Sequence, residues 1–372
     1  MDTRNEKLAH NLITNSIKLK NKDNLLIEVF GESGLELANE IISQAKQICA
    51  QPILNVVKYE ELKKFLINSD TDAIIKYGER DYDRMKKMQA YIGISSPTSD
   101  KPLDGVPNEK LESYNKYYTE LVHLKQRVNN TKWCILRYPN EYYANKSNMT
   151  LEEFKDFYYN VCNINYEKMK NAMEPLKRLM STTDKVHIIA PGTDLTFSIK
   201  EIPAEMYYGT FNLPDGEVAT CPIKESVNGY ITYNTKTKYN ETIFENIRFE
   251  FKDGKIIKAI AENDTEKLNR ILDTDEGARY IGEFAIGLNP YINNTMCDTL
   301  FDEKINGSFH FTPGMALEKS NNGNKSAIHW DIVKILREEY GGGKICFDNV
   351  LIMKDGKFVL PELIPLNPEN LK

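Results

Sequence analysis

The sequence LLIEVFGESGLELANEIISQAKQICAQPILNVVKY, residues 25–59, places a helical pattern between two strand-like runs. Residues 25–30 and 53–59 are continuous or nearly continuous apolar runs, typical of buried strands. Between them, residues 33–49 carry apolar side chains at the spacing of one helix face. This order of strand, helix and strand predicts a parallel sheet covered by helices.

The same alternation continues along the first half of the chain. Residues 90–95 (AYIGIS) and 133–138 (WCILRY) are further strand-like runs, and a long amphipathic helix is predicted over about residues 108–128. Each helix would connect two strands of one sheet. We therefore expect all of these strands to run parallel to one another.

A helix is also predicted from residue 150 towards residue 180. It begins with a capping box, because Thr150 and Glu153 stand three positions apart in front of an apolar pattern. The helix ends in the polar segment STTDK, which is the best candidate for a boundary. The sequence thus predicts an N-terminal α/β domain over residues 1–183.

Beyond this boundary the pattern changes to short strands joined by tight turns. Asp253-Gly254 lies between RFEFK and KIIKAIA, and Asp355-Gly356 lies between VLIMK and KFVL. Asp-Gly between two strand-like runs is a strong hairpin signal. One helical insertion is expected over about residues 265–277. Residues 184–372 are therefore predicted to form a β-rich, mainly antiparallel domain.

The overall composition excludes several classes of protein. A net charge of −6 argues against a protein that neutralises nucleic-acid phosphates over a wide surface. No stretch approaches the roughly 20 apolar residues of a membrane span, and the polar N-terminal segment does not resemble a signal peptide. The turn GESG lacks the spacing of a dinucleotide-binding loop and a phosphate-binding lysine. We expect a cytoplasmic protein without a membrane, nucleic-acid or nucleotide partner.

The cysteines are too dispersed for a disulfide framework or a zinc knot, since none forms a CxxC pair. We expect them to be buried thiols. They are Cys49, Cys134, Cys162, Cys221, Cys297 and Cys346.

The five histidines divide into two groups by context. Three lie in helical or apolar strand patterns, where a structural role is expected. The other two lie near strand ends, in SFHFTPG and SAIHWDIV. The first group is His10, His123 and His187, and the second is His310 and His329.

The segment around His329 contains the pattern HxD. In a strand, residues two positions apart point to the same face, so His329 and Asp331 can face one site together. An imidazole nitrogen beside carboxylate oxygens suits zinc, cobalt or manganese. The spacing alone leaves an ordinary solvent-exposed strand face as the alternative.

Two glutamates have informative surroundings. Glu217 follows a Pro-Asp-Gly turn in FNLPDGEVAT, and Glu283 is the one acid in the apolar run of RYIGEFAIGLNP. A carboxylate in a buried strand is costly unless a cation or hydrogen bonds compensate it. Glu283 therefore requires a partner, which is either a metal ion or a basic side chain such as Arg279.

Seven segments, read in order, resemble the thermophilic-type metalloaminopeptidases, the family of aminopeptidase T and aminopeptidase S. The resemblance extends from about residue 8 to about residue 360. The segments are LAHNLITNSIKLKNKDNLLIEV, WCILRYPNEYYANKSNMTLEEF, APGTDLTFSI, FNLPDGEVATCP, IGEFAIGLNP, DTLFDEKINGSFHFTPG and NKSAIHWDIV.

The resemblance implies a dinuclear metal site and an activity. Two divalent cations (zinc, cobalt or manganese) would activate a water that hydrolyses N-terminal residues from short peptides, in a homodimer with an α/β domain followed by a β-rich metal domain. Glu283 and Asp331 are the candidates to bridge the cations; catalytic residues beyond the ligands stay unassigned. The implied ligands are Glu217, Glu283, His310, His329 and Asp331.

One position departs from the family pattern. Family members often carry a tyrosine a few residues after the third ligand, where this chain has Leu317. Tyr340 is a possible substitute. The departure leaves open a relative that binds metal and peptide without turnover. A dinuclear phosphoesterase is disfavoured, because no lysine or arginine cluster accompanies the site motifs.

Overall fold

The computed structural model describes residues 2–240 and 242–372. By their contacts, these residues form two compact units, each described separately below. Unit 1 extends to Asn163 and includes Gly209–Leu213, whereas unit 2 comprises Ile164–Tyr208 and Pro214–Lys372. The predicted division after residue 183 concerns domains that fold independently, and it stays a prediction.

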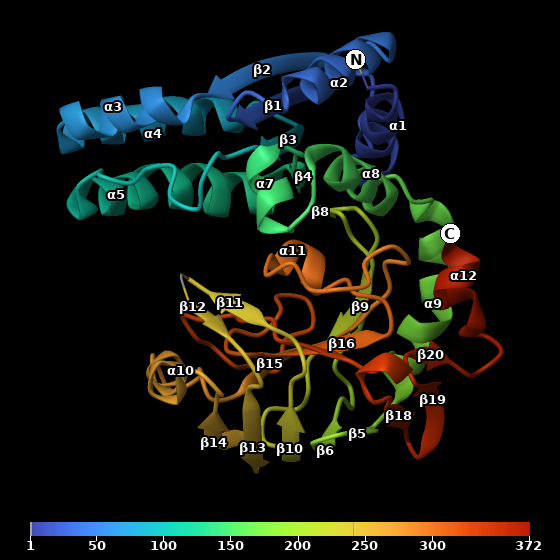
Figure 1. Ribbon diagram of the computed structural model, residues 1–372. Helices are drawn as coiled ribbons and strands as arrows, with labels where there is room; N and C mark the ends of the chain where they lie inside the picture. Colours follow the sequence, from blue (N-terminus) through green and yellow to red (C-terminus); the bar gives the residue numbers. More distant parts are fainter. Residues whose placement is uncertain (1, 241) are drawn as a thin grey trace. The chain divides into compact units, whose positions relative to one another are not determined.

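Unit 1 contains the predicted parallel sheet, with five strands in the order β2-β1-β3-β4-β8 (Figure 1). The centre of β1 is buried throughout, so its sequence is a continuous apolar run with a single acid, Glu28. The strands are β1 (Asn24–Phe30), β2 (Gln51–Val57), β3 (Ala90–Ser95), β4 (Lys132–Arg137) and β8 (Asn212–Leu213).

The helices of unit 1 include those predicted between the strands. Helix α2 buries Leu37, Ile41 and Ala45 as the spacing requires. The predicted helix over residues 108–128 is confirmed, although most of it has π-helical winding. The helices are α1 (Arg4–Asn11), η1 (Leu12–Ser16), α2 (Leu35–Gln47), α3 (Tyr59–Asn68), α4 (Thr71–Met85), α5 (Asn108–Tyr114), η2 (Asn115–Arg127), α6 (Val128–Asn130), α7 (Glu141–Lys146) and α8 (Leu151–Cys162).

The single helix predicted from residue 150 towards residue 180 is wrong, because the segment forms two helices. The capping box of Thr150 and Glu153 is confirmed at the start of α8. A second helix, α9 (Tyr166–Thr182), begins where the Asn165 side chain accepts a hydrogen bond of 2.9 Å from the Lys168 amide. Helix α9 belongs to unit 2.

Unit 2 is built on two larger antiparallel sheets and a small hairpin. The eight-stranded sheet has the order β14-β13-β10-β6-β5-β18-β19-β20, and the five-stranded sheet has the order β17-β16-β15-β9-β7. The first contains β5 (Lys185–Ala190), β6 (Thr193–Ser198), β10 (Asn228–Thr232), β13 (Arg248–Lys252), β14 (Lys255–Ile260), β18 (Lys344–Phe347), β19 (Val350–Lys354) and β20 (Lys357–Phe358). The second contains β7 (Glu205–Tyr207), β9 (Glu217–Thr220), β15 (Ile281–Gly287), β16 (Ser308–Pro313) and β17 (Val333–Ile335), and the hairpin contains β11 (Thr237–Tyr239) and β12 (Thr242–Phe244).

Both predicted Asp-Gly hairpins are confirmed. Asp253 and Gly254 join β13 to β14 with φ of 49° and 83°, and Asp355 and Gly356 join β19 to β20 with φ of 50° and 76°. Two consecutive positive φ angles match the right-handed twist of the flanking strands. The predicted helical insertion is α10 (Thr265–Leu272). The remaining helices are α11 (Thr299–Asp302), η3 (Glu338–Tyr340), η4 (Ile364–Leu366) and α12 (Pro368–Leu371).

Aromatic side chains fill the core between the two large sheets of unit 2. The ring of Phe197 on β6 lies 5.0 Å from the rings of both Phe284 on β15 and Phe311 on β16. All three are nearly inaccessible, and burial of each stabilises the fold by roughly 2–3 kcal/mol. Because side chains alternate along a strand, the sequence neighbours of Phe284 and Phe311 point to the opposite face of the five-stranded sheet. That face carries the site described below.

Two expectations on composition can be compared with the structure. Cys134, Cys162 and Cys221 are buried, but the expectation is wrong for Cys49, which is exposed, and holds only partly for Cys297 and Cys346. Within residues 2–240 and 242–372, no helix has the length and apolar character needed to span a bilayer.

Candidate metal centre

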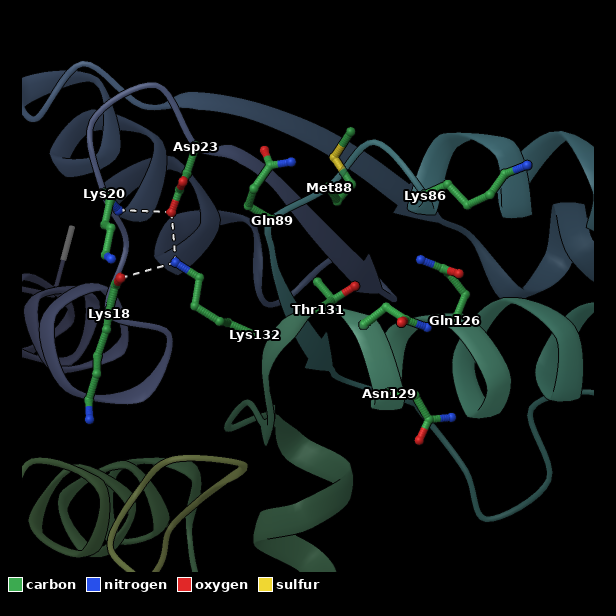
Figure 2. Close-up of a pocket in the computed structure, with 11 residues that line it drawn as sticks. Lys18, Lys20, Asp23, Lys86, Met88, Gln89, Gln126, Asn129, Thr131 and Lys132 are labelled. Carbon is green, nitrogen blue, oxygen red and sulfur yellow. Dashed lines mark hydrogen bonds and ion pairs between the residues drawn. The ribbon is translucent and has the colours of Figure 1, made fainter.

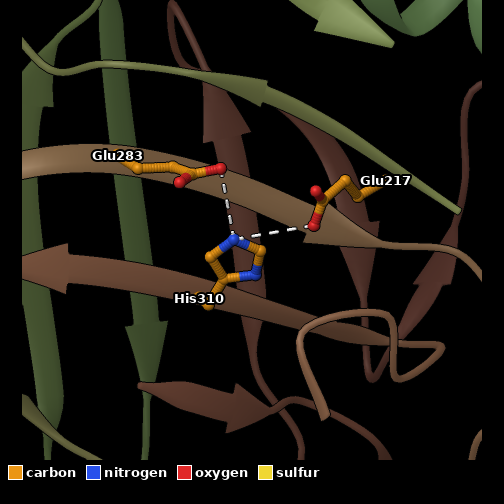
Figure 3. Close-up of side chains that lie close together, drawn as sticks. All are labelled: Glu217, Glu283 and His310. Atoms are coloured by element: carbon orange, nitrogen blue, oxygen red, sulfur yellow. Dashed lines mark hydrogen bonds and ion pairs between the residues drawn. The ribbon is translucent and has the colours of Figure 1, made fainter. Parts of the chain in front are cut away.

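The five residues implied as ligands come together in unit 2. Figure 3 shows the Glu217, Glu283 and His310 side chains converging from three neighbouring strands. Their donor atoms form one group within 4.8 Å of one another, the inner group. Glu283, His329 and Asp331 form a second such group, the outer group. Glu283 belongs to both.

Strand register explains why the inner residues meet. Glu217 on β9 pairs with Gly287 on β15, and His310 on β16 pairs with Ala285. Directly paired residues point to the same face, so these side chains share the face that carries Glu283, which pairs with Thr312. Gly287, which has no side chain, lets the backbone of Lys304 and Ile305 approach this face closely, since a Cβ there would overlap with the Ile305 carbonyl oxygen.

The distances in the inner group match the edges of a coordination polyhedron. His310 Nε2 lies 3.4 Å from Glu283 Oε1 and 3.6 Å from Glu217 Oε2. These separations are longer than good hydrogen bonds. Ligand atoms at about 2.1 Å from a tetrahedral cation are roughly 3.4 Å apart. The three donors are therefore spaced to hold one cation between them.

The outer group has the same spacing and a fixed imidazole. His329 Nε2 lies 3.1 Å from Glu283 Oε2 and 3.2 Å from Asp331 Oδ1. His329 Nδ1 lies 2.8 Å from the Met315 carbonyl, to which it donates, so that Nε2 is free to bind a cation. Thr312 Oγ1 donates to Asp331 Oδ1 at 2.8 Å. The two oxygens of Glu283 thus face different groups.

Burial distinguishes the two groups. The side chains of Glu217, Glu283 and His310 are at most 7% exposed, whereas that of His329 is 35% exposed. In the described part of the chain, buried Glu217 Oε2 and His310 Nδ1 have no hydrogen-bond partner. A buried carboxylate oxygen without a donor is costly, and a cation in the inner group would compensate it. The residues therefore fit a metal site.

The cluster favours positive charge at its two imidazoles. Burial opposes charge on His310, but its contact with Glu283 and the charge of Glu217 outweigh burial and raise the pKa of His310 to about 9. Burial likewise opposes charge on His329, yet the charge of Asp331 raises its pKa well above the ordinary value. Burial would raise the pKa of Glu283, but the contacts with both histidines hold that pKa low.

A buried lysine completes the site, and the sequence did not indicate it. Lys304 Nζ lies 2.6 Å from Glu217 Oε1, 2.7 Å from Glu303 Oε1 and 3.5 Å from Asp215 Oδ1. The Lys304 side chain is 1% exposed. Burial raises the pKa of Glu217 to about 7, and the nearby Lys304 charge only partly offsets this. Lys304 is a single lysine among three acids, so the expectation that no lysine or arginine cluster accompanies the motifs is unaffected.

The alternative of an ion pair between Glu283 and Arg279 is not what the structure contains. Arg279 Nε pairs with Asp273 Oδ1 at 2.6 Å, while Glu283 contacts the two histidines. The three histidines expected to be structural lie outside both ligand groups. His187 pairs with Asp194 at 2.8 Å, and the ring of His123 accepts a hydrogen bond from Arg127 at 3.2 Å, whereas His10 is exposed.

A tyrosine does border the site, although not at the positions considered from the sequence. Tyr340 donates to Asn294 Oδ1 at 3.0 Å. Leu317 is partly buried, and its amide donates to the Gly282 carbonyl. Tyr207 on β7 pairs directly with Glu217, so its side chain shares the face of the inner group. Burial raises the pKa of Tyr207, which keeps its hydroxyl protonated.

A large surface pocket in unit 1 has a different chemistry. It measures about 820 Å³ and lies where β1, β3 and β4 begin (Figure 2). Its ion pair joins Lys132 to Asp23 at 2.7 Å. Neither group of candidate metal ligands in the described part of the chain includes a residue of this pocket. The lining residues are Lys18, Lys20, Asp23, Lys86, Met88, Gln89, Gln126, Asn129, Asn130, Thr131 and Lys132.

Comparison with solved structures supports the fold. The chain is similar to a structure described as wild-type AmpT from Thermus thermophilus, with a TM-score of 0.79. The alignment covers 96% of this chain and 99% of that one at 22% sequence identity. An N-terminal α/β region with a parallel sheet followed by a β-rich antiparallel region is therefore confirmed.

Sequence comparison identifies the family. The chain is 24% identical to aminopeptidase PepS of Streptococcus thermophilus over 381 residues, covering 88% of this chain and 91% of that protein. It is 32% identical to aminopeptidase AmpS of Bacillus subtilis over 164 residues, covering 40% and 39% of the two chains. The model of the thermophilic metalloprotease (M29) family matches residues 1–358. The chain belongs to the thermophilic metalloprotease (M29) family.

Proposed function

We propose that this chain is an aminopeptidase that removes N-terminal residues from short peptides with the help of two divalent cations. The supporting observation is the pair of overlapping donor groups that share Glu283 in a chain of the M29 family. Its relatives are named aminopeptidases. The proposed ligands are Glu217, Glu283, His310, His329 and Asp331.

The side chains have distinct roles in this proposal. The inner cation would be held by Glu217, Glu283 and His310, and the outer cation by Glu283, His329 and Asp331. When bound, two such cations lower the pKa of a water and polarise the scissile carbonyl. Nitrogen and oxygen ligands of this kind accept zinc, cobalt and manganese.

The protein contributes orientation and access. Glu283 directs one oxygen to each group, which supports its role as the bridging ligand, whereas the Asp331 carboxylate contacts His329 and Thr312. The hydrogen bond from His329 to Met315 fixes the ring that faces solvent. A peptide would approach from this exposed side, because the inner ligands are buried.

Peptide hydrolysis by metal-loaded protein tests the proposal. Protein stripped with a chelator and then loaded with zinc, cobalt or manganese is expected to release the first residue of di-, tri- and tetrapeptides. The same peptides with an acetylated N-terminus provide the control and should not be cleaved. Absence of release with all three metals on a broad peptide panel would reject the aminopeptidase.

A relative that binds metal and peptide without turnover is the alternative, motivated by Leu317 at the expected tyrosine position. The same preparations distinguish the two. Such a relative would bind two equivalents of metal and bind peptide without releasing an amino acid. Tyr207 beside Glu217 favours the active enzyme, because it offers a protonated hydroxyl at the site.

The proposal includes a homodimer in the cytoplasm. Both features come from the family resemblance and the composition of the chain. Light scattering on purified protein measures the mass directly, and a dimer should have twice the 42.8 kDa of one chain. Cell fractionation tests the location.

A further inference from the structure

Lys304 is an unusual residue, because its ammonium lies inside the protein among carboxylates. The side chain is 1% exposed and contacts three acids at 2.6, 2.7 and 3.5 Å. The three acids are also shielded, with side chains 1% to 13% exposed. Three buried carboxylates would repel one another without a cation between them. Lys304 therefore balances part of this charge, as any buried cation there would.

The contact with Glu217 has a geometric consequence as well. Lys304 Nζ holds Glu217 Oε1 at 2.6 Å, while Oε2 faces His310 Nε2 at 3.6 Å. In the described part of the chain, Oε2 accepts no hydrogen bond. A glutamate side chain has several rotamers, and a strong charge-assisted bond to one oxygen selects one of them. The second oxygen is thereby presented to the inner group.

We propose that Lys304 is a positioning residue that fixes Glu217 as a one-oxygen ligand of the inner cation. This inference rests on the proposed metal centre. Lys304 Nζ also pairs with Glu303 Oε1 at 2.7 Å and lies 3.5 Å from Asp215 Oδ1, so two further acids favour its position beside Glu217. Partners that orient a ligand in this way typically contribute about 10- to 100-fold in metal affinity or activity.

The alternative is that Lys304 has a purely electrostatic role. This role predicts that removal of Lys304 changes the metal affinity in the opposite direction. A lysine that only supplied positive charge would repel a nearby metal ion. Its removal would then tighten metal binding. If Lys304 positions Glu217, its removal must weaken binding of the inner cation and leave the outer cation, which does not use Glu217, nearly unchanged.

Titration of the full chain with cobalt(II) chloride separates the two roles. We expect chelator-treated wild-type protein to bind two equivalents by calorimetry. In Lys304→Met, the affinity for one equivalent should fall about tenfold or more, while the other stays within twofold. The kcat for a dipeptide should fall, with KM within twofold. Wild-type affinity for both equivalents, or tighter binding, would overturn the inference.

Lys334→Met is the matched control. Lys334 is also buried in unit 2, at 2% exposure, but its ammonium donates to the carbonyls of Thr232 at 2.6 Å and Pro191 at 3.2 Å. It lies on β17 opposite Phe309, on the face away from the inner group. Lys334→Met should lose stability as Lys304→Met does, yet bind both equivalents of cobalt as wild type does.

If Lys304→Met does not fold, as judged by circular dichroism, the variant Lys304→Arg tests the inference instead. Lys304→Arg retains the charge but carries its donors in a rigid fork on a longer side chain. It should fold and lose about tenfold affinity for one equivalent, and unchanged affinity would contradict positioning. If wild-type protein itself binds no cobalt, the proposed metal centre fails instead, so the two failures are distinguishable.

Discussion

Glu283 is the residue on which both donor groups depend. Its Oε1 faces His310 at 3.4 Å and its Oε2 faces His329 at 3.1 Å. Because the two oxygens point to different imidazoles, a substitution of Glu283 is expected to affect both donor groups. The Asp331 carboxylate contacts His329 and Thr312, so a change there acts first on the outer group.

Glu283→Gln is therefore expected to impair binding of both cations, because a neutral amide cannot bridge them as a carboxylate does. We expect the loss in kcat/KM to exceed the roughly 100-fold that loss of a hydrogen-bond partner of a metal ligand can cost. Asp331→Asn is the comparison and should weaken one cation only. Calorimetric titration with zinc checks both variants. Two tight equivalents in Glu283→Gln would contradict the bridging role.

Tyr207 is expected to assist catalysis as a hydrogen-bond donor. It shares the strand face of Glu217, and its raised pKa keeps the proton needed to donate to a substrate oxygen. Tyr207→Phe should lower kcat by roughly 100-fold, the effect of losing one oxyanion donor. Tyr340→Phe, whose hydroxyl bonds to Asn294, should stay within twofold of wild type. Equal kcat in the two variants would exclude this role.

Residues differ in how far sequence alone could assign them. The pattern HxD and the lone acid of an apolar strand are local signals, so Glu283, His329 and Asp331 could be selected. Lys304 could not, because it lies in the charged segment DEKING, which is typical of an exposed turn. Its burial depends on Glu217, which is 87 positions earlier in the chain and joins it only in the folded state.

At the level of elements, the strands were predictable and some helices were not. The Asp-Gly turns and apolar runs define β13, β14 and β1 without tertiary information. The break between α8 and α9 has no glycine or proline to mark it, and it depends on Asn165 as a new cap. The π-helical winding of η2 likewise has no signal in the local pattern.

Helix η2 brings His123 against the sheet of unit 1, next to Glu28 on β1. The His123 side chain is 12% exposed and its Nε2 lies 3.8 Å from Glu28 Oε2. Burial, followed by the charges of Arg127 and Arg84, lowers the pKa of His123 to about 3. The folded protein therefore favours the neutral imidazole.

This shift predicts an acid-sensitive helix. The unfolded chain binds a proton at His123 near pH 6.5, whereas the folded chain binds it near pH 3, so the stability is present above pH 6.5 and is lost as pH falls towards 3. Between pH 7.5 and pH 5.0, protonation of His123 is expected to lower the free energy of unfolding by about 2 kcal/mol. His123→Gln should lose correspondingly less stability over this range. Hydrogen exchange of β1 and η2 measures it, and equal pH sensitivity would contradict the prediction.

For the whole molecule, the fold and the family follow from the chain, while the division into independently folding parts is a proposal. The predicted boundary after residue 183 places α9 in the N-terminal part, whereas the contacts assign α9 to unit 2. The polar segment STTDK ends the helix but does not show what the helix packs against. The unit to which α9 belongs depends on how its side chains pack in the folded chain, and a local sequence pattern does not contain this information.

Metal removal should reveal whether the two units respond separately. Since the proposed ligands all lie in unit 2, a bound cation stabilises that unit by linkage, by about 2.7 kcal/mol at 100 times its Kd. A chelator should therefore increase hydrogen exchange in β9, β15 and β16. The strands β1 and β3 of unit 1 should exchange as before. An equal increase in all five strands would show that the units unfold together.

The alternation of side chains along β15 and β16 has a consequence for how this protein can change. Phe284 and Phe311 point into the core, and Glu283 and His310 point away from it. The candidate metal ligands and the side chains that pack the core therefore lie on opposite faces of the same two strands. New reactivity could be selected on one side by substituting alternate positions, while the aromatic packing that keeps the sheets together is inherited unchanged.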